Sequence, residues 1–175
     1  MRILVFFLFF TSLFSSEYDD LLLRAQASMY PKIILLDKNI NTKIIDNMVS
    51  LTIIYEKKEM DRAKKFKDMI DHEYNSKIGT YEFKVNLLSI KNFSDLDTST
   101  AYYIFDTAGT NKKPVILHSI DNNRICFSYN YKDFNKGALI SLFLKEKTYI
   151  YINKSFINVY SIKFVPIFYK IAKAI

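Results

Sequence analysis

The chain has 175 residues and a formal net charge of +7, with three glycines, two histidines and one cysteine. Its lysines are scattered among acidic residues, a pattern typical of solvated surfaces, so we expect no nucleic-acid partner. The glycines are too few and too far apart for a dinucleotide or phosphate loop. The histidines and the cysteine are too few for a zinc cluster, so we expect no metal and no cofactor.

The first twenty residues read MRILVFFLFFTSLFSSEYDD. The apolar run from Ile3 to Phe14 is shorter than the roughly 20 residues that cross a bilayer. This segment has the order of parts of a secretory signal peptide. The positively charged Arg2 comes first, the apolar block follows, and the small residues Ser15 and Ser16 precede the acidic residues. The alternative is a buried first element of the fold. We therefore expect residues 1–16 to be removed and residues 17–175 to form one domain in the periplasm.

The single cysteine, Cys126, excludes an intramolecular disulfide. Its neighbours Ile125 and Phe127 place it in an apolar strand, which favours a buried structural role. The alternative is an intermolecular disulfide, because unpaired cysteines of exported chains often find partners.

The first two thirds of the chain alternate helical and strand patterns. Tyr18, Leu22, Ala25 and Met29 follow the spacing of an amphipathic helix that Pro31 interrupts or restarts. Residues 49–55 predict a strand buried on both faces, and residues 58–76 predict an amphipathic helix. Residues 81–90 alternate as a strand at or near an edge, and residues 101–105 predict another short buried strand.

The later elements are less uniform. Residues 114–130 fit either a β-hairpin or a short helix followed by a strand, and the local pattern does not decide between them. Two alternating runs in ALISLFLKEKTYIYIN predict a hairpin, after which Asn153 caps a short turn. Residues 164–175 predict a closing helix whose inward side chains are Val165, Phe168, Ile171 and Ile175.

This order of elements predicts an α/β fold, a layered domain with a mixed, mostly parallel sheet. Its carboxylate pairs, Asp19 with Asp20 and Asp95 with Asp97, lie in polar segments where nothing would raise a pKa for acid catalysis. No serine has the surroundings of a nucleophile elbow. We therefore expect that the protein is not an enzyme, and we find no catalytic residues.

The remaining candidates are aromatic. Tyr129, Tyr131 and Phe134 follow a predicted strand end, where sheet proteins often carry binding loops. Aromatic side chains there favour a partner-binding patch, although the same rings could merely cover the core. Asp106 and Thr107 follow the adjacent predicted strand and could lie beside them.

The C-terminal third, FSYNYKDFNKGALISLFLKEKTYIYINKSFINVYSIKFVPIFYKIAKAI, resembles the closing region of the YfiR-like family of exported bacterial regulators. Gly137 stands before a hydrophobic strand, a hairpin surrounds Glu146, and Ile152 with Asn153 precedes the last helix. RAQASMYPKIILLDK, SLTIIYE and AYYIFD fit the family's first helix, its first strand and a later strand. The chain departs from the family in having one cysteine where some relatives have redox-responsive pairs, and in having a single glycine, after Lys136, where a double glycine is usual.

The resemblance implies a Rossmann-like domain without a nucleotide-binding loop, with a helix over residues 112–122 and a strand over residues 124–129. It also implies a structural role for Gly137. Characterised relatives are periplasmic, often dimeric, and repress a membrane-bound diguanylate cyclase by binding its periplasmic sensor.

We therefore expect a regulator that binds a membrane-bound diguanylate cyclase or sensor histidine kinase, with a homodimer as one expected form. The alternative is a small-ligand-binding module with its pocket near Asp106 and Tyr129.

Overall fold

In the computed structural model, which describes residues 3–105 and 111–175, one eight-stranded sheet runs in the order β2-β3-β1-β4-β5-β6-β7-β8. β3, β1, β4, β5 and β6 are parallel, whereas β2 and β7 run antiparallel to their neighbours β3 and β6. The side chains are described from Glu17 onward, again without residues 106–110. The predicted α/β fold with a mixed, mostly parallel sheet and a C-terminal hairpin is confirmed.

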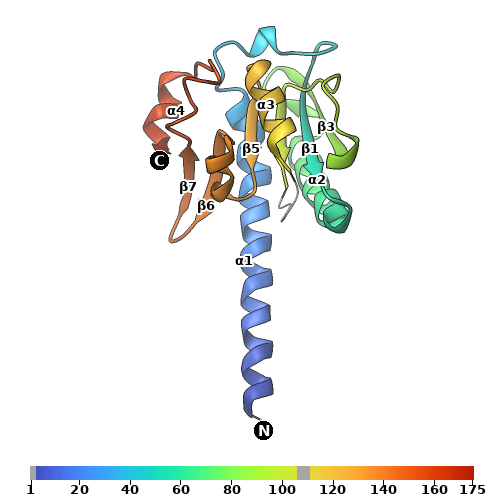
Figure 1. The fold of residues 1–175 in the computed structure, drawn as a ribbon, viewed down its shortest axis with the longest axis vertical. Helices are drawn as coiled ribbons and strands as arrows, with labels where there is room; N and C mark the ends of the chain where they lie inside the picture. Colours follow the sequence, from blue (N-terminus) through green and yellow to red (C-terminus); the bar gives the residue numbers. More distant parts are fainter. Residues whose placement is uncertain (1–2, 106–110) are drawn as a thin grey trace.

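The first element, α1 (Ile3–Ile34), is one continuous helix whose N-terminal part projects well away from the sheet (Figure 1). Pro31 lies inside its last turns, so the predicted interruption there is wrong. The packing of Tyr30, Ile33 and Ile34, all fully buried, outweighs the one backbone hydrogen bond that proline removes. The predicted apolar stripe is also shifted, because the completely buried side chains are Leu23, Gln26, Ala27, Tyr30 and Ile34.

The βα unit expected in the first half is present. β1 (Met48–Tyr55) is buried along almost its whole length and leads into α2 (Met60–Tyr74), which buries Ala63, Phe66 and Ile70. The short β2 (Lys77–Ile78) and β3 (Tyr81–Ser89) follow at the sheet edge. In β3, Phe83 and Val85 are buried, while Glu82 and Lys84 are exposed, as the alternation predicted.

The ambiguous segment after residue 113 is a helix and then a strand. β4 (Ala101–Ile104) and β5 (Ile125–Ser128) pair in parallel, and α3 (Lys113–Asp121) connects them. A parallel pair needs a crossover connection, which a two-residue hairpin turn cannot supply. The structure therefore agrees with the helix that the family resemblance implied.

The last third forms β6 (Ile140–Leu144), β7 (Thr148–Ile152), α4 (Pro166–Ile171) and β8 (Ala172–Ala174). The prediction of a closing helix to residue 175 is wrong beyond Ile171, because the chain turns into β8 and pairs with β7. Phe168 is buried as expected, but Ile171 and Ile175 are about half exposed, at 49% and 50%. Short 3-10 turns complete the fold at Ile40–Thr42, Lys57–Glu59, Ile90–Asn92 and Tyr131–Lys136.

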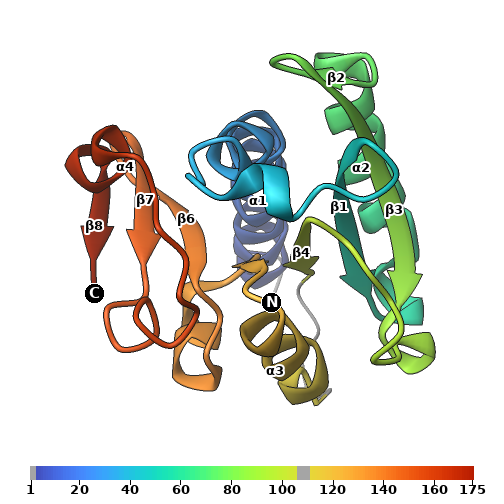
Figure 2. The same ribbon diagram turned by 90° about the horizontal axis from the view of Figure 1, so that it is seen from above.

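The sheet has helices on both faces (Figure 2). Successive residues of β4 show the two layers, since the Tyr103 ring contacts Tyr30 of α1 and Phe66 of α2, whereas the Tyr102 ring contacts His118 of α3. β1 lies between β3 and β4, so the chain reverses its direction of winding at β1. In such sheets ligands bind outside the carboxyl ends of the strands at this reversal.

Two further findings concern the predictions about single residues and the membrane. Cys126 is a free, fully buried thiol of β5, so its predicted burial in an apolar strand is confirmed, and it presents no exposed surface to a second thiol. Within the part of the chain that the structure describes, no helix combines the length and the hydropathy needed to cross a bilayer. The removal of residues 1–16 stays a prediction.

Candidate functional site

The three aromatic residues predicted to bind a partner are placed differently. Tyr131 is 42% exposed, Tyr129 is half-buried, and Phe134 is 8% exposed and belongs to the core. The core-covering alternative therefore holds for Phe134. Asp106 and Thr107, which were expected beside these rings, lie outside the described residues.

A short helical turn, Tyr131–Lys136, presents Tyr131, and local chemistry fixes it at both ends. The side chain of Asn130 accepts a hydrogen bond from the Lys132 N–H, 2.9 Å away. Gly137 ends the turn with φ +106°, and a Cβ there would lie 3.0 Å from Ile116 Cγ2. An L-residue would be strained and crowded at this position, which explains why glycine is needed.

Asn153 fixes the turn to the hairpin from the other side. Its buried amide donates hydrogen bonds to the carbonyl oxygens of Phe134 and Ala138, each 2.9 Å away. Its side-chain oxygen accepts from the Ser155 N–H at 3.2 Å, as the prediction of a capped turn requires. Gly137 and Asn153, both predicted to have structural roles, therefore lie at the same junction, between the turn Tyr131–Lys136 and the hairpin.

Tyr131 belongs to a larger aromatic group on the hairpin. Its ring meets Phe143 of β6 edge-on at 5.8 Å, Phe143 stacks with Tyr151 of β7 at 6.2 Å, and Tyr151 stacks with Tyr149 at 6.3 Å. Lys173 of β8 places its ammonium 3.9 Å from the centre of the Tyr149 ring. We call this surface the aromatic–lysine face; its members are Tyr131, Phe143, Lys145, Lys147, Tyr149, Tyr151 and Lys173.

Strand alternation explains why these rings point away from the core. Leu142 and Ile150 face α1 and are buried, and the Leu142 N–H donates to the Tyr30 hydroxyl at 3.0 Å. Phe143, Tyr149 and Tyr151 occupy the alternate positions and therefore point to the other side of the sheet, where they are half-buried. The sequence analysis recognised the hairpin but missed this outward face.

The charge of the chain is concentrated in the same region. Residues 129–175 contain eight lysines and two acidic residues, which accounts for most of the net charge of +7. Lys145 and Lys147 flank Glu146 at the hairpin tip, with their ammonium groups 5.8 Å and 5.5 Å from the centres of the Phe143 and Tyr149 rings. Counting charge by segment, rather than over the whole chain, would have revealed this basic third.

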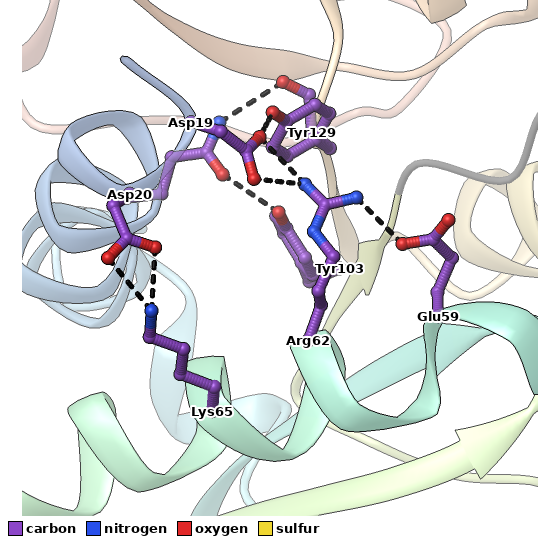
Figure 3. A network of polar contacts seen from close by, with 8 residues as sticks. Asp19, Asp20, Glu59, Arg62, Lys65, Tyr103 and Tyr129 are labelled. Carbon is purple, nitrogen blue, oxygen red and sulfur yellow. Dashed lines mark hydrogen bonds and ion pairs between the residues drawn. The ribbon is translucent and has the colours of Figure 1, made fainter. Parts of the chain in front are cut away.

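Tyr129 takes part in a different group, at the carboxyl ends of β4 and β5 (Figure 3). Its hydroxyl donates to the Asp19 carboxylate of α1, which also receives two hydrogen bonds from one terminal nitrogen of Arg62, at 2.7 and 2.6 Å. The other terminal nitrogen of Arg62 donates to Glu59 at 2.7 Å. The sequence analysis took Asp19 for a solvated acid, because its partners lie more than forty positions away.

The aromatic rings under Arg62 complete this group. Its guanidinium carbon lies 5.0 Å from the centre of the Phe105 ring and 5.4 Å from that of Tyr129, and these two rings stack at 5.7 Å. Burial by itself would lower the pKa of Arg62, but the charges of Asp19 and Glu59 outweigh it and the pKa is raised. Arg62 therefore stays fully charged beneath a carboxylate.

The two histidines and the cysteine have different surroundings. His118 is buried with its Nε2 3.1 Å from the Tyr102 hydroxyl, whereas His72 is exposed on α2. Burial raises the pKa of the Cys126 thiol to about 12. Among the described residues, no three His, Cys, Asp or Glu side chains lie close enough together to hold a metal ion.

A small hollow connects the two groups of residues. It measures about 220 Å³ and lies between α1, the turn after β5 and the end of β6. Its lining is Tyr18, Leu22, Tyr129, Asn130, Tyr131, Lys132, Leu142 and Phe143. The expected pocket near Tyr129 therefore has a counterpart among the described residues.

No protein-family model matches the chain, and no curated protein matches it. Among solved structures, an ABC domain from Streptococcus pneumonia in complex with L-Trp is similar, with a TM-score of 0.51 and 9% sequence identity. The match covers 82% of this chain and 60% of that chain, so this chain spans less than two thirds of its neighbour. At this identity the likeness shows the α/β fold alone, and the resemblance to YfiR-like regulators stays a prediction.

Proposed function

We propose that the protein is a non-enzymatic periplasmic regulator that binds the periplasmic sensor part of an inner-membrane diguanylate cyclase or histidine kinase and represses it. The observation that supports this proposal is the aromatic–lysine face, where the rings of Phe143, Tyr151 and Tyr149 stack along the hairpin with lysines beside them. Aromatic side chains bury much area at little cost in entropy and dominate many protein interfaces.

The charges on this face specify the kind of partner surface. Lys145, Lys147 and Lys173 surround the rings, so an acidic surface would be attracted and oriented by them. Repression then needs a difference in affinity, because a ligand shifts a two-state sensor only as far as it prefers one state. The proposed face would prefer the inactive state of the sensor.

The test compares two double variants in the bacterium that encodes the chain. Tyr149→Ser with Tyr151→Ser removes two rings of the face, whereas Ile167→Ser with Tyr169→Ser removes two exposed apolar side chains of α4. We expect overproduction of the parent and of the α4 variant to lower cellular cyclic di-GMP, and the face variant to lose this effect. If the parent leaves cyclic di-GMP and sensor-kinase output unchanged, the proposal is wrong.

A small-ligand-binding module is the second candidate. It is supported by the hollow beside Tyr129 at the carboxyl ends of the parallel strands, and by a neighbour of similar fold whose structure holds L-Trp. A thermal-shift screen of small metabolites tests it, because a ligand that binds the folded state raises the melting temperature. A screen without any concentration-dependent shift would refute it.

A further inference from the structure

Arg62 forms one side of a carboxylate cradle with Tyr129. Arg62 lies near the start of α2, which follows β1 after a short 3-10 turn, and Tyr129 directly follows β5. Both donate to the same carboxylate (Figure 3). The guanidinium also lies over the rings of Phe105 and Tyr129. The fork of an arginine and a converging hydroxyl match the geometry of a carboxylate.

The position of this cradle differs from that of a helix clamp, by which we mean a salt bridge that only joins two helices. The neighbouring pair of Asp20 and Lys65 joins the same two helices at the surface, with side chains 41% and 50% exposed. The cradle instead joins Arg62 of α2, the helix after β1, to Tyr129 at the carboxyl end of β5, with Phe105 at the carboxyl end of β4 beneath the guanidinium. It therefore lies next to the point where the winding of the sheet reverses. Ligands of open α/β sheets bind at this place.

The carboxylate in the cradle comes from α1 and not from the sheet. Asp19 lies two residues after Glu17, where the exported chain is expected to begin once residues 1–16 are removed. The first turn of a helix lacks intrahelical partners for its N–H groups and frays more easily than its interior. Asp19 would then be an intramolecular occupant that can leave the cradle.

We propose that Arg62 and Tyr129 form a binding site for a small organic monocarboxylate, and that Asp19 occupies this site as a built-in competitor. The hollow of about 220 Å³ shares Tyr129 with the cradle and adds Leu22, Leu142 and Phe143 to its lining. A ligand of the site therefore combines one carboxylate with a small apolar body. This proposal rests on the second candidate function, for which it names the site and the ligand class.

The binding test uses benzoate as the probe and the chain as purified after export, in four forms: the parent, Asp19→Asn, Asp20→Asn, and Asp19→Asn combined with Arg62→Lys. Asp19→Asn removes the competing charge, whereas Asp20→Asn breaks the adjacent helix clamp and leaves the cradle occupied. Binding is followed by the Arg62 side-chain N–H resonance and by calorimetric titration, with uncharged benzamide as the matched ligand control.

We expect Asp19→Asn to bind benzoate at least tenfold more tightly than the parent and Asp20→Asn, because an occupied site weakens apparent affinity by its occupancy. Adding Arg62→Lys should cancel the gain, and benzamide should not bind. If folded Asp19→Asn binds benzoate no better than Asp20→Asn, Asp19 and Arg62 are only a helix clamp. A screened metabolite that stabilises the Asp19→Asn and Asp19→Asn/Arg62→Lys forms equally would leave the ligand function standing and refute this site.

Discussion

The buried pair of Lys112 and Asp133 gives the sharpest test of how the turn that carries Tyr131 is held. Lys112 precedes α3, and its Nζ lies 2.7 Å from Asp133 Oδ2, with side chains only 4% and 5% exposed. A second lysine, Lys136, lies 3.3 Å from the other Asp133 oxygen, but its side chain is 52% exposed. Replacing Lys112 by Met leaves a buried carboxylate with this one outer partner.

Removing one partner of a buried ion pair costs about 3–5 kcal/mol, and because Lys136 still compensates part of the charge we expect about 3 kcal/mol for Lys112→Met. For a chain of this size that corresponds to a fall in melting temperature of roughly 6–12 °C. Lys136→Met, at an exposed site, should cost less than about 1 kcal/mol.

The assay is urea unfolding followed by circular dichroism, with the free energy of unfolding extrapolated to water. Lys112→Met combined with Asp133→Leu should recover most of the loss, because the uncompensated charge is gone. If Lys112→Met is no more destabilising than Lys136→Met, the buried pair does not hold the turn and the reasoning is refuted.

Four further predictions address single groups. Tyr30→Phe should cost about 1–3 kcal/mol in urea unfolding, because the buried Leu142 N–H loses its acceptor; a cost below 0.5 kcal/mol would contradict this. Gly137→Ala should lower the free energy of unfolding by about 2 kcal/mol or more in the same assay, because the position requires a positive φ and the added methyl group would crowd Ile116; an unchanged unfolding midpoint would show that the turn adapts. The Cys126 thiol, whose pKa burial raises to about 12, should react with an aromatic disulfide reagent only after unfolding, and rapid labelling of the native chain would refute its burial. The hydrogen bond from Lys65 lowers the pKa of Asp20 below 3.8, so the pair stabilises the fold above that pH and loses its effect as the pH falls through the lowered pKa. Asp20→Asn should therefore be less stable than the parent at pH 7, by under about 1 kcal/mol, and the difference should shrink as the pH falls below 3.8; a difference that does not change with pH would exclude this pair as the cause.

The elements that the sequence predicted correctly are those with a strong local pattern. The buried strand β1 and the amphipathic helix α2 follow from an apolar run and from a 3.6-residue period, respectively. The alternation of residues 81–90 likewise predicted a strand near the edge. In these segments the pattern of burial repeats within the element itself, so neighbours along the chain are sufficient to predict it.

The errors lie where distant contacts outweigh the local preference. The local pattern predicts that residues 172–174 are the end of a helix, but they form hydrogen bonds with β7 and become the strand β8. Pro31 reads as a helix break, but the burial of the residues around it keeps α1 continuous to Ile34. Local propensity is a weak prior against such tertiary packing.

The candidate sites show the same division. The sequence by itself determined that glycine loops and metal clusters are missing from it, that Cys126 belongs in an apolar strand, and that aromatic residues follow β5, because residue types and their near neighbours decide these points. Only the tertiary structure decided that Phe134 is buried, that the hairpin rings share one outward face, and that Asp19 meets Arg62 and Tyr129. The physical reason is that strand register and helix docking bring together side chains separated by tens of residues, and no local period encodes that pairing.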